Sequence, residues 1–140
     1  MSAVRRRGRP AAALRPAARY REALPRVEQF AEQARRVVES ALTEWDLDAL
    51  AADAGLVVTE LFANAVRHAR GSRVLVDVIR LEGRGVEVAV ADKSRRPPAP
   101  REPGEDEEEG RGLLLVAAYA ARWGTDPRPR GKRVWAEVRR

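Results

Sequence analysis

Two side chains that can act together on a hydroxyl group, Glu60 and Asn64, stand four positions apart in a segment with helical periodicity. Residues at this spacing lie on one face of an α-helix, with Cβ atoms about 5–6 Å apart. A carboxylate can accept the proton of a hydroxyl, and an amide oxygen can bind a Mg²⁺ ion that keeps several of its waters. The same spacing is also found in a solvated helical stripe or in a hydrogen bond between helices. Spacing alone favours these structural interpretations.

Asp92 and the glycine pair Gly110 and Gly112 form a second group of candidate ligand contacts. Asp92 ends an apolar, strand-like run, where its carboxylate can accept a hydrogen bond from an exocyclic amine such as that of adenine. The two glycines would let backbone N–H groups approach phosphate at the start of a helix, where the helix dipole favours anions. Each feature also has a structural interpretation: a turn residue at the end of a strand for Asp92, and a tight turn for the glycines.

Two amphipathic helices are predicted in the first half of the chain. The first begins near Pro25, and apolar residues recur at three- and four-residue spacing as far as Leu42. The second is predicted over residues 48–69 and carries Glu60 and Asn64 along one edge. This second helix is apolar around most of its circumference, which is typical of a helix buried between a sheet and another helix.

Alternation of apolar residues predicts that the remaining elements are mostly strands. Residues 93–109 lack periodicity and contain four prolines, so we expect a long, mobile, lid-like loop there, followed by a short helix from Gly110 to Ala121. This order predicts an α+β fold, a two-layer α/β sandwich with a mixed, mostly antiparallel sheet and helices on one face. The predicted strands are an edge strand near residues 19–24, a hairpin over residues 74–92, and strands near residues 122–126 and 132–139.

Charge and composition limit the kinds of site that are possible. Residues 1–22 contain seven Arg and one Glu, a net of +6 that equals the charge of the whole chain, so the remainder is neutral. We expect residues 1–22 to be a disordered Arg-rich arm and residues 23–140 to form one domain. The absence of Cys and the presence of a single His exclude thiolate and histidine-cluster metal sites. The longest apolar run, residues 113–121, is shorter than the about 20 residues of a membrane span, so a soluble protein is expected.

The order of these features resembles a known superfamily. The matching segments are residues 58–69, 90–94, 110–116 and 122–137, and the resemblance covers about residues 25–140. The chain resembles the small ATP-binding domains of the gyrase, chaperone, histidine kinase and MutL superfamily. It is most similar to the actinobacterial branch related to anti-sigma-factor serine kinases.

This resemblance implies the Bergerat ATP-binding fold, a histidine kinase-like ATPase domain with ATP and Mg²⁺ as cofactors. It implies that Asn64 binds Mg²⁺, that Asp92 binds the adenine amine, and that Glu60 is the general base in phosphoryl transfer. The further ATP-binding residues that it implies are Gly110, Arg111, Gly112 and Leu113. The sequence departs from the family pattern at Lys93 and Ser94, where glycines usually follow the aspartate, and in the acidic run at residues 105–109.

The function that the resemblance implies is that of a cytoplasmic serine/threonine kinase that binds a sigma factor and phosphorylates an anti-anti-sigma protein. A homodimer is a further expectation, because members of the family commonly act as dimers. The alternative is a non-catalytic, ATP-dependent protein-binding regulator, and the presence of Glu60 favours the kinase. Neither a membrane nor a nucleic acid is expected as a direct partner; nucleic-acid binding through residues 1–22 would weaken steeply with salt and disappear when they are deleted.

Overall fold

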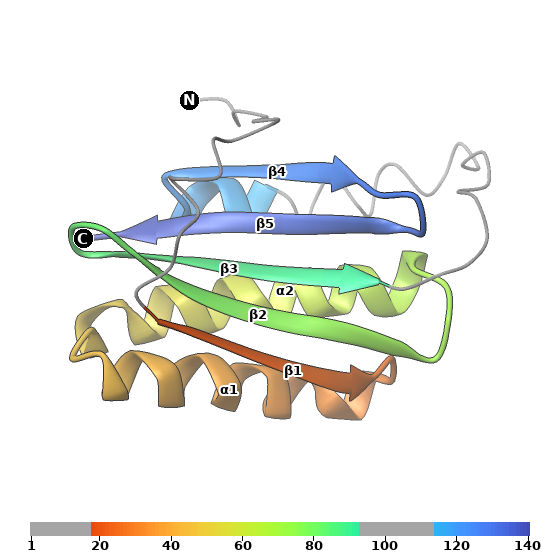
Figure 1. Cartoon of the computed structure of the whole chain (residues 1–140), viewed down its shortest axis with the longest axis horizontal. Helices are drawn as coiled ribbons and strands as arrows, with labels where there is room; N and C mark the ends of the chain where they lie inside the picture. The colour runs from red at the N-terminus through yellow and green to blue at the C-terminus, as the bar shows by residue number, and fades with distance from the viewer. Residues whose placement is uncertain (1–17, 93–113) are drawn as a thin grey trace.

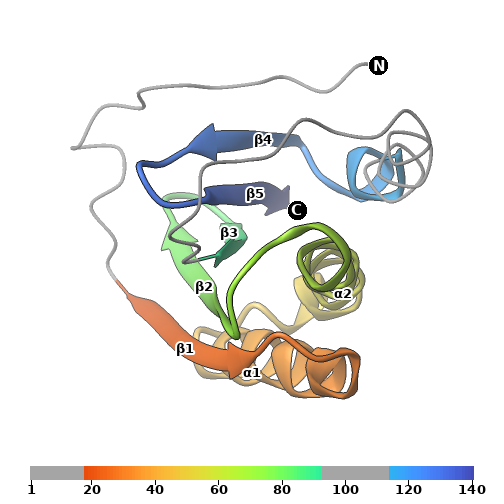
Figure 2. The same ribbon diagram turned by 90° about the vertical axis from the view of Figure 1, so that its right-hand side faces the viewer.

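The computed structural model describes residues 18–92 and 114–140, which form a sheet covered on one face by helices (Figures 1 and 2). The sheet has five strands in the order β1-β2-β3-β5-β4. Residues 114–119 are helical and lie on the same side of the sheet as α1 and α2 (Figure 2). The elements are β1 (Arg19–Pro25), η2 (Glu28–Phe30), α1 (Ala31–Glu44), η3 (Asp48–Leu50), α2 (Ala51–His68), β2 (Arg73–Leu81), β3 (Gly85–Asp92), β4 (Arg122–Pro127) and β5 (Lys132–Arg139).

The architecture confirms the predicted α+β sandwich and corrects one detail of its sheet. Every pair of neighbouring strands is antiparallel, so the expectation of a mixed sheet is wrong. The crossover after β3 leads to β4, which points the same way as β3 (Figure 1). These two strands would form a parallel pair if they were neighbours, but the hairpin that follows β4 places β5 between them.

The predicted boundary between arm and domain, at residue 22, falls inside a strand. β1 begins at Arg19 and pairs with β2 from Arg19↔Ile79 to Pro25↔Arg73, which confirms the edge strand expected near residues 19–24. The sheet therefore includes four residues that the composition had assigned to the arm. Tyr20 of this strand also contacts the helical layer: it donates a hydrogen bond to Glu44 of α1, and its ring lies 5.7 Å from that of Trp45. Residues 1–17 and the predicted loop at 93–109 lie outside the described residues.

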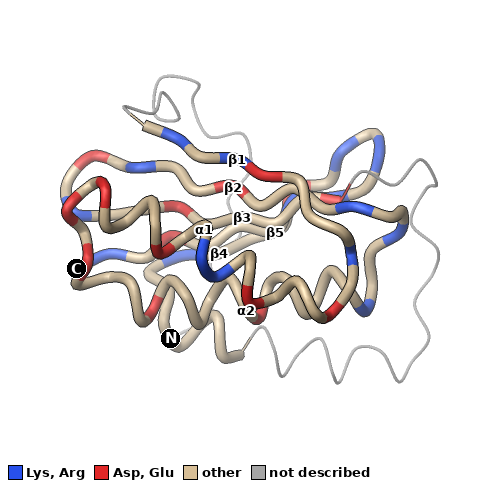
Figure 3. Tube along the Cα trace, turned by 90° about the horizontal axis from the view of Figure 1, so that it is seen from below, with Lys and Arg blue, Asp and Glu red and all other residues tan. Residues whose placement is uncertain are grey.

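The hydrophobic core lies between the sheet and the helices. Alternate valines of β2, β3 and β5 face α1 and α2, as the period of two in these segments predicts. α1 carries charged residues of both signs, whereas α2 is mostly uncharged (Figure 3). The helical span Asp48–His68 contains an 18-residue window with a mean hydropathy of 1.4 and has the length to cross a membrane, but its buried side chains belong to this core. The largest fully buried core side chains of the two helices are Phe62, Leu42, Leu61, Val38, Val57 and Val58.

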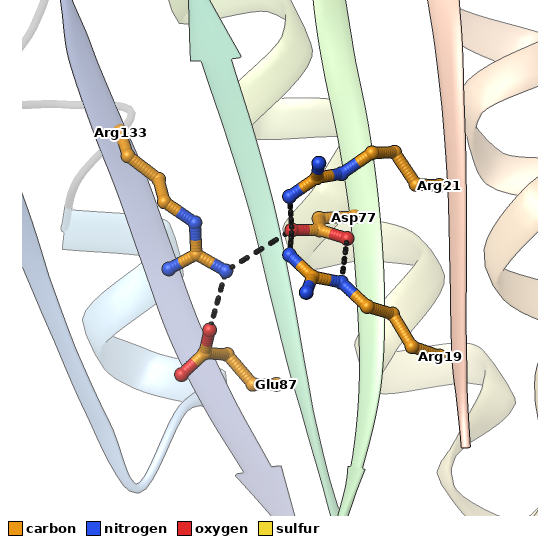
Figure 4. Close-up of polar contacts among 5 residues, drawn as sticks. All are labelled: Arg19, Arg21, Asp77, Glu87 and Arg133. Carbon is orange, nitrogen blue, oxygen red and sulfur yellow. Dashed lines mark hydrogen bonds and ion pairs between the residues drawn. The ribbon is translucent and has the colours of Figure 1, made fainter. Parts of the chain in front are cut away.

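The other face of the sheet, which no described helix covers, carries five charged side chains that we call the Asp77 network (Figure 4). Arg19 donates two hydrogen bonds to Asp77, Nε–Oδ1 at 3.0 Å and Nη2–Oδ2 at 2.7 Å. Arg21 Nη2 lies 3.3 Å from the same Oδ2. Arg133 Nη2 lies 2.6 Å from Glu87 Oε2 and 3.4 Å from Asp77 Oδ2. The network therefore connects β1, β2, β3 and β5.

The centre of this network is buried: Asp77 is 3% exposed, Glu87 0% and Arg133 6%. A charged group removed from water is tolerated when it is paired and hydrogen-bonded, because its partners replace the lost hydration. Burial would raise the pKa of Asp77, but the hydrogen bonds from Arg19 and Arg21 outweigh this effect, and the pKa of Asp77 lies below its ordinary value. The carboxylate is therefore ionised in the folded protein at neutral pH.

The lowered pKa of Asp77 predicts a loss of stability in acid. A carboxyl group whose pKa is lower in the folded than in the unfolded state stabilises the fold above the unfolded pKa, about 3.9 for Asp. This contribution is lost as the pH falls through the folded pKa. We expect the difference in free energy of unfolding between the wild type and Asp77→Asn to shrink as the pH falls below about 4, measured by urea denaturation at a series of pH values. A difference that stays constant across this range would contradict the prediction.

Candidate functional site

Glu60 and Asn64 lie one helical turn apart on α2, as predicted, but their surroundings differ. Asn64 is buried at 7% exposure, whereas Glu60 is half-buried. α2 packs closely against α1 at Gly55. A Cβ atom added to this glycine would lie 3.1 Å from Arg35 Cγ of α1. Glu60 is therefore the more accessible of the two polar groups.

The Asn64 side chain belongs to a residue that is 7% exposed, and its amide has unused hydrogen-bonding capacity. Within residues 18–92 and 114–140, its side chain makes no hydrogen bond. An amide in this state can bind a ligand without first breaking a bond to the protein.

Asp92 is the last residue of β3 and is buried at 7% exposure. All eight residues of this strand are buried, which explains why its sequence is a nearly continuous apolar run. Asp92 pairs with Val74 of β2, one position beyond the last pair between β3 and β5, Ala91↔Arg133. The carboxylate therefore stands at the end of the ladder that joins β3 to β5.

The C-terminal ends of α2 and β3 and the turn between β4 and β5 lie at the same end of the sandwich (Figure 1). Figure 2 views the molecule from this end. Arg26, which follows β1, secures the end of α2 there: it donates from Nη1 to the carbonyl of Val66 at 2.7 Å and from Nε to the carbonyl of Gly71 at 2.6 Å. The first of these bonds satisfies a carbonyl group that the last turn of α2 leaves without a partner, and the second holds the segment that follows the helix. The fold thus brings Asn64 and Asp92 to one end of the molecule.

Gly131 is a contact of Asp92 that the sequence did not single out. It lies in the turn between β4 and β5 and has φ of 87°, a conformation that side-chain-bearing residues rarely adopt. A Cβ atom at this position would lie 1.7 Å from Asp92 Oδ1, so the carboxylate occupies the space of the missing side chain. A glycine between two strands predicts a turn, but it does not predict which side chain fills the space beside it.

The remaining predicted ligand contacts lie outside the described residues. They are Gly110, Arg111, Gly112 and Leu113, together with the departures from the family pattern at residues 93–94 and the acidic run at residues 105–109. The chain is described again from Leu114, where it is helical as far as Tyr119, two residues short of the predicted end at Ala121. Leu114 is 70% exposed and Tyr119 is 42% exposed.

Sequence reasoning also missed the Asp77 network and the role of Arg26. The signal for the network was present, because Asp77, Glu87 and Arg133 all occupy strand positions opposite to the core-facing valines. Such positions are usually solvated, so their burial was not expected. Among the described residues, no group of three or more His, Cys, Asp and Glu side chains could hold a metal ion.

Comparison with known proteins agrees with this architecture. Residues 23–138 match the family described as the histidine kinase-like ATPase domain. A chain of the SiaB–SiaC complex from Pseudomonas aeruginosa has the same fold, with a TM-score of 0.60 and 15% sequence identity over 91% of this chain and 92% of that chain. No curated protein matches. Because the family match spans α1, α2 and all but the first four and the last residue of the sheet, the chain belongs to the histidine kinase-like ATPase domain family.

Proposed function

We propose that this protein is an ATP-binding regulator of the anti-sigma-factor type that transfers the γ-phosphoryl group of ATP to a serine or threonine of an antagonist protein. The observation that carries the proposal is the Asn64 side chain, which belongs to a residue that is 7% exposed and has no hydrogen bond to a described residue. It lies at the same end of the fold as Asp92, in a chain of the histidine kinase-like ATPase domain family. Both groups have the chemistry that Mg²⁺-ATP requires.

In this proposal Asp92 accepts a hydrogen bond from the exocyclic amine of adenine, and Gly110, Arg111, Gly112 and Leu113 also contact the nucleotide. The Asn64 oxygen would hold Mg²⁺, which supplies charge neutralisation at the phosphates; one amide with phosphate oxygens and waters is a sufficient set of ligands. The half-buried position of Glu60 suits contact with an incoming protein substrate better than the buried position of Asn64 does.

The proposed reaction assigns one step to Glu60. The hydroxyl oxygen of the substrate serine or threonine attacks the γ-phosphorus, and the bond from the γ-phosphorus to the β–γ bridging oxygen breaks. The hydroxyl proton passes to the Glu60 carboxylate, and ADP leaves with the electron pair of the broken bond. Most of the rate enhancement in such a reaction comes from positioning and charge stabilisation, so a single carboxylate is a sufficient base.

The proposed partners are a sigma factor and an anti-anti-sigma protein. The SiaB–SiaC structure is, by its description, a complex of two proteins, and it supports the idea that a domain of this fold binds a protein partner. We propose that the protein acts in the cytoplasm, where ATP and both partners are present, and that it forms a homodimer. No direct contact with nucleic acid or with a membrane belongs to the proposal.

Binding of Mg²⁺-ATP provides the first test. A ligand that binds only the folded state at a hundred times its Kd stabilises that state by about 2.7 kcal/mol. We expect thermal unfolding of the wild type to shift upward with Mg²⁺-ATP, and we expect Asn64→Ala and Asn64→Asp to lose most of the shift. The quantity compared is the difference between melts with and without nucleotide, so that any intrinsic destabilisation by the substitution cancels.

A matched control is Gln33→Ala, which removes an exposed amide from α1. This variant should keep the full nucleotide-dependent shift. Equal shifts in the wild type and in both Asn64 variants would contradict the assignment of Mg²⁺-ATP binding to Asn64.

A further inference from the structure

The turn between β4 and β5 places a backbone atom against the candidate adenine-binding carboxylate. The turn is closed by a hydrogen bond from Arg128 N–H to the Gly131 carbonyl at 3.0 Å, and Gly131 has φ of 87°. A Cβ atom on Gly131 would lie 1.7 Å from Asp92 Oδ1, 2.7 Å from Asp92 Cγ and 3.0 Å from the Asp92 carbonyl oxygen. A methyl group and the present carboxylate position therefore cannot coexist.

This contact is different from that of another glycine with a positive φ. Gly83, in the turn between β2 and β3, has φ of 76°, but a Cβ atom there would meet only Arg139 Nη1, at 3.3 Å. That atom is the end of a long, flexible side chain, which can move at little cost. Asp92, by contrast, is a short side chain on a fully buried strand, so its carboxylate has few other positions.

We propose that Gly131 is a positioning residue for nucleotide selection: it leaves the space that lets the Asp92 carboxylate stand at the end of β3 and accept the adenine amine. This inference rests on the proposed ATP-binding function and adds the residue that controls its base selectivity. A hydrogen bond requires a heavy-atom separation of about 2.7–3.2 Å. A side chain at residue 131 has to move Asp92 Oδ1 by more than 1 Å to reach a normal contact distance, which is enough to break such a bond.

Displacement of the Asp92 carboxylate weakens the binding of ATP more than the binding of GTP. Adenine offers an amine that donates to Asp92, whereas guanine has a carbonyl oxygen at the corresponding position and cannot donate. Displacement of the carboxylate therefore removes a favourable contact with ATP and relieves a repulsive one with GTP. A general loss of stability would not change the ratio of the two affinities.

The test compares Gly131→Ala with Gly83→Ala, since both place a Cβ on a glycine with positive φ but only the first meets Asp92. Isothermal titration of each variant with Mg²⁺-ATP and Mg²⁺-GTP gives the two Kd values. We expect the Kd for ATP to rise about ten- to a hundredfold in Gly131→Ala, which is the range for loss of a hydrogen bond to a charged group. The preference for ATP over GTP should fall by a similar factor, and Gly83→Ala should match the wild type in both.

A double variant shows whether the effect passes through Asp92. In the Asp92→Ala background, Gly131→Ala should change the Kd for ATP by less than threefold, because the displaced group is already absent. If Gly131→Ala does not fold, Gly131→Asn replaces it, since Asn adopts positive φ more readily and still carries a Cβ.

The outcomes separate the inference from the function on which it rests. A wild type that binds no ATP would refute the proposed function. A wild type that binds ATP and an Asp92→Ala variant that binds it more weakly, together with a Gly131→Ala variant of unchanged affinity and selectivity, would overturn the role of Gly131 alone. The role of Gly131 would also be overturned if Gly131→Ala and Asp92→Ala raise the Kd for ATP by equal factors and the double variant raises it by the product of the two. The two substitutions would then act independently.

Discussion

Replacing Arg133 with methionine is expected to lower the free energy of unfolding by about 3–5 kcal/mol, the range for removal of one partner from a buried ion pair. Arg133 lies 2.6 Å from Glu87, which is 0% exposed, and 3.4 Å from Asp77. Methionine keeps most of the volume of the side chain and removes its charge, so the loss reports the ion pairs and not a cavity. Asp77 keeps Arg19 and Arg21 as partners, so most of the cost is expected at Glu87. Urea denaturation of both proteins measures the difference.

Two control variants test whether the loss of stability in Arg133→Met comes from its buried ion pairs. Arg35→Met removes the charge that lies 2.5 Å from Glu32 on α1, where both side chains are about half exposed, and should cost no more than about 1 kcal/mol. The double variant Arg133→Met with Glu87→Met should recover most of the lost stability, because it leaves no buried charge without its partner. A loss in Arg133→Met no larger than that in Arg35→Met would show that Arg133 is not needed to stabilise these buried carboxylates.

Replacing Glu60 with glutamine is expected to reduce phosphoryl transfer by about a hundred- to ten-thousandfold, the range for removal of a general base. Glutamine has nearly the same shape but cannot accept the hydroxyl proton. ATP binding should be unchanged, since Asn64 and Asp92 remain. The assay is transfer of radiolabelled γ-phosphate from ATP to proteins that copurify with the chain, with the nucleotide-dependent thermal shift measured on the same samples.

The matched control is Asp53→Asn, which neutralises an exposed carboxylate in the first turn of the same helix and should transfer phosphate at the wild-type rate. A Glu60→Gln variant with the wild-type rate would remove Glu60 from the reaction. A wild type that binds ATP and labels no candidate protein would favour the non-catalytic regulator, the alternative that the sequence left open.

The sequence predicted the elements of this fold well because each depends on a local period. The valines at alternate positions of β2 and β3 specify strands with one face in the core, and the three- and four-residue spacing in α1 specifies a helix with one buried face. The motif on α2 was equally local: Glu60 and Asn64 share a helical edge wherever the helix lies. These features place the two polar groups next to each other without any knowledge of the rest of the fold.

The predictions were wrong where the local sequence pattern favours one structure and the tertiary contacts stabilise another. Residues 19–22 share the Arg-rich composition of the preceding segment, so composition assigned them to the arm. In the structure Arg19 and Arg21 lie on an edge strand and bind Asp77, and this pairing makes them part of the sheet. The mixed sheet was expected from the order of helices and strands along the chain, but the neighbours of each strand depend on which strand of the β4–β5 hairpin meets β3.

The sequence by itself thus determined the helices, the strands, their order and the polar residues that each one carries. Only the tertiary structure decided which of these residues meet across the sheet: Arg133 and Asp77, separated by 56 positions, and Gly131 with Asp92. The reason is physical. Periodicity specifies the face to which a side chain points, but its neighbours on that face belong to other strands, and their order is set by the chain crossings and by packing of the whole core.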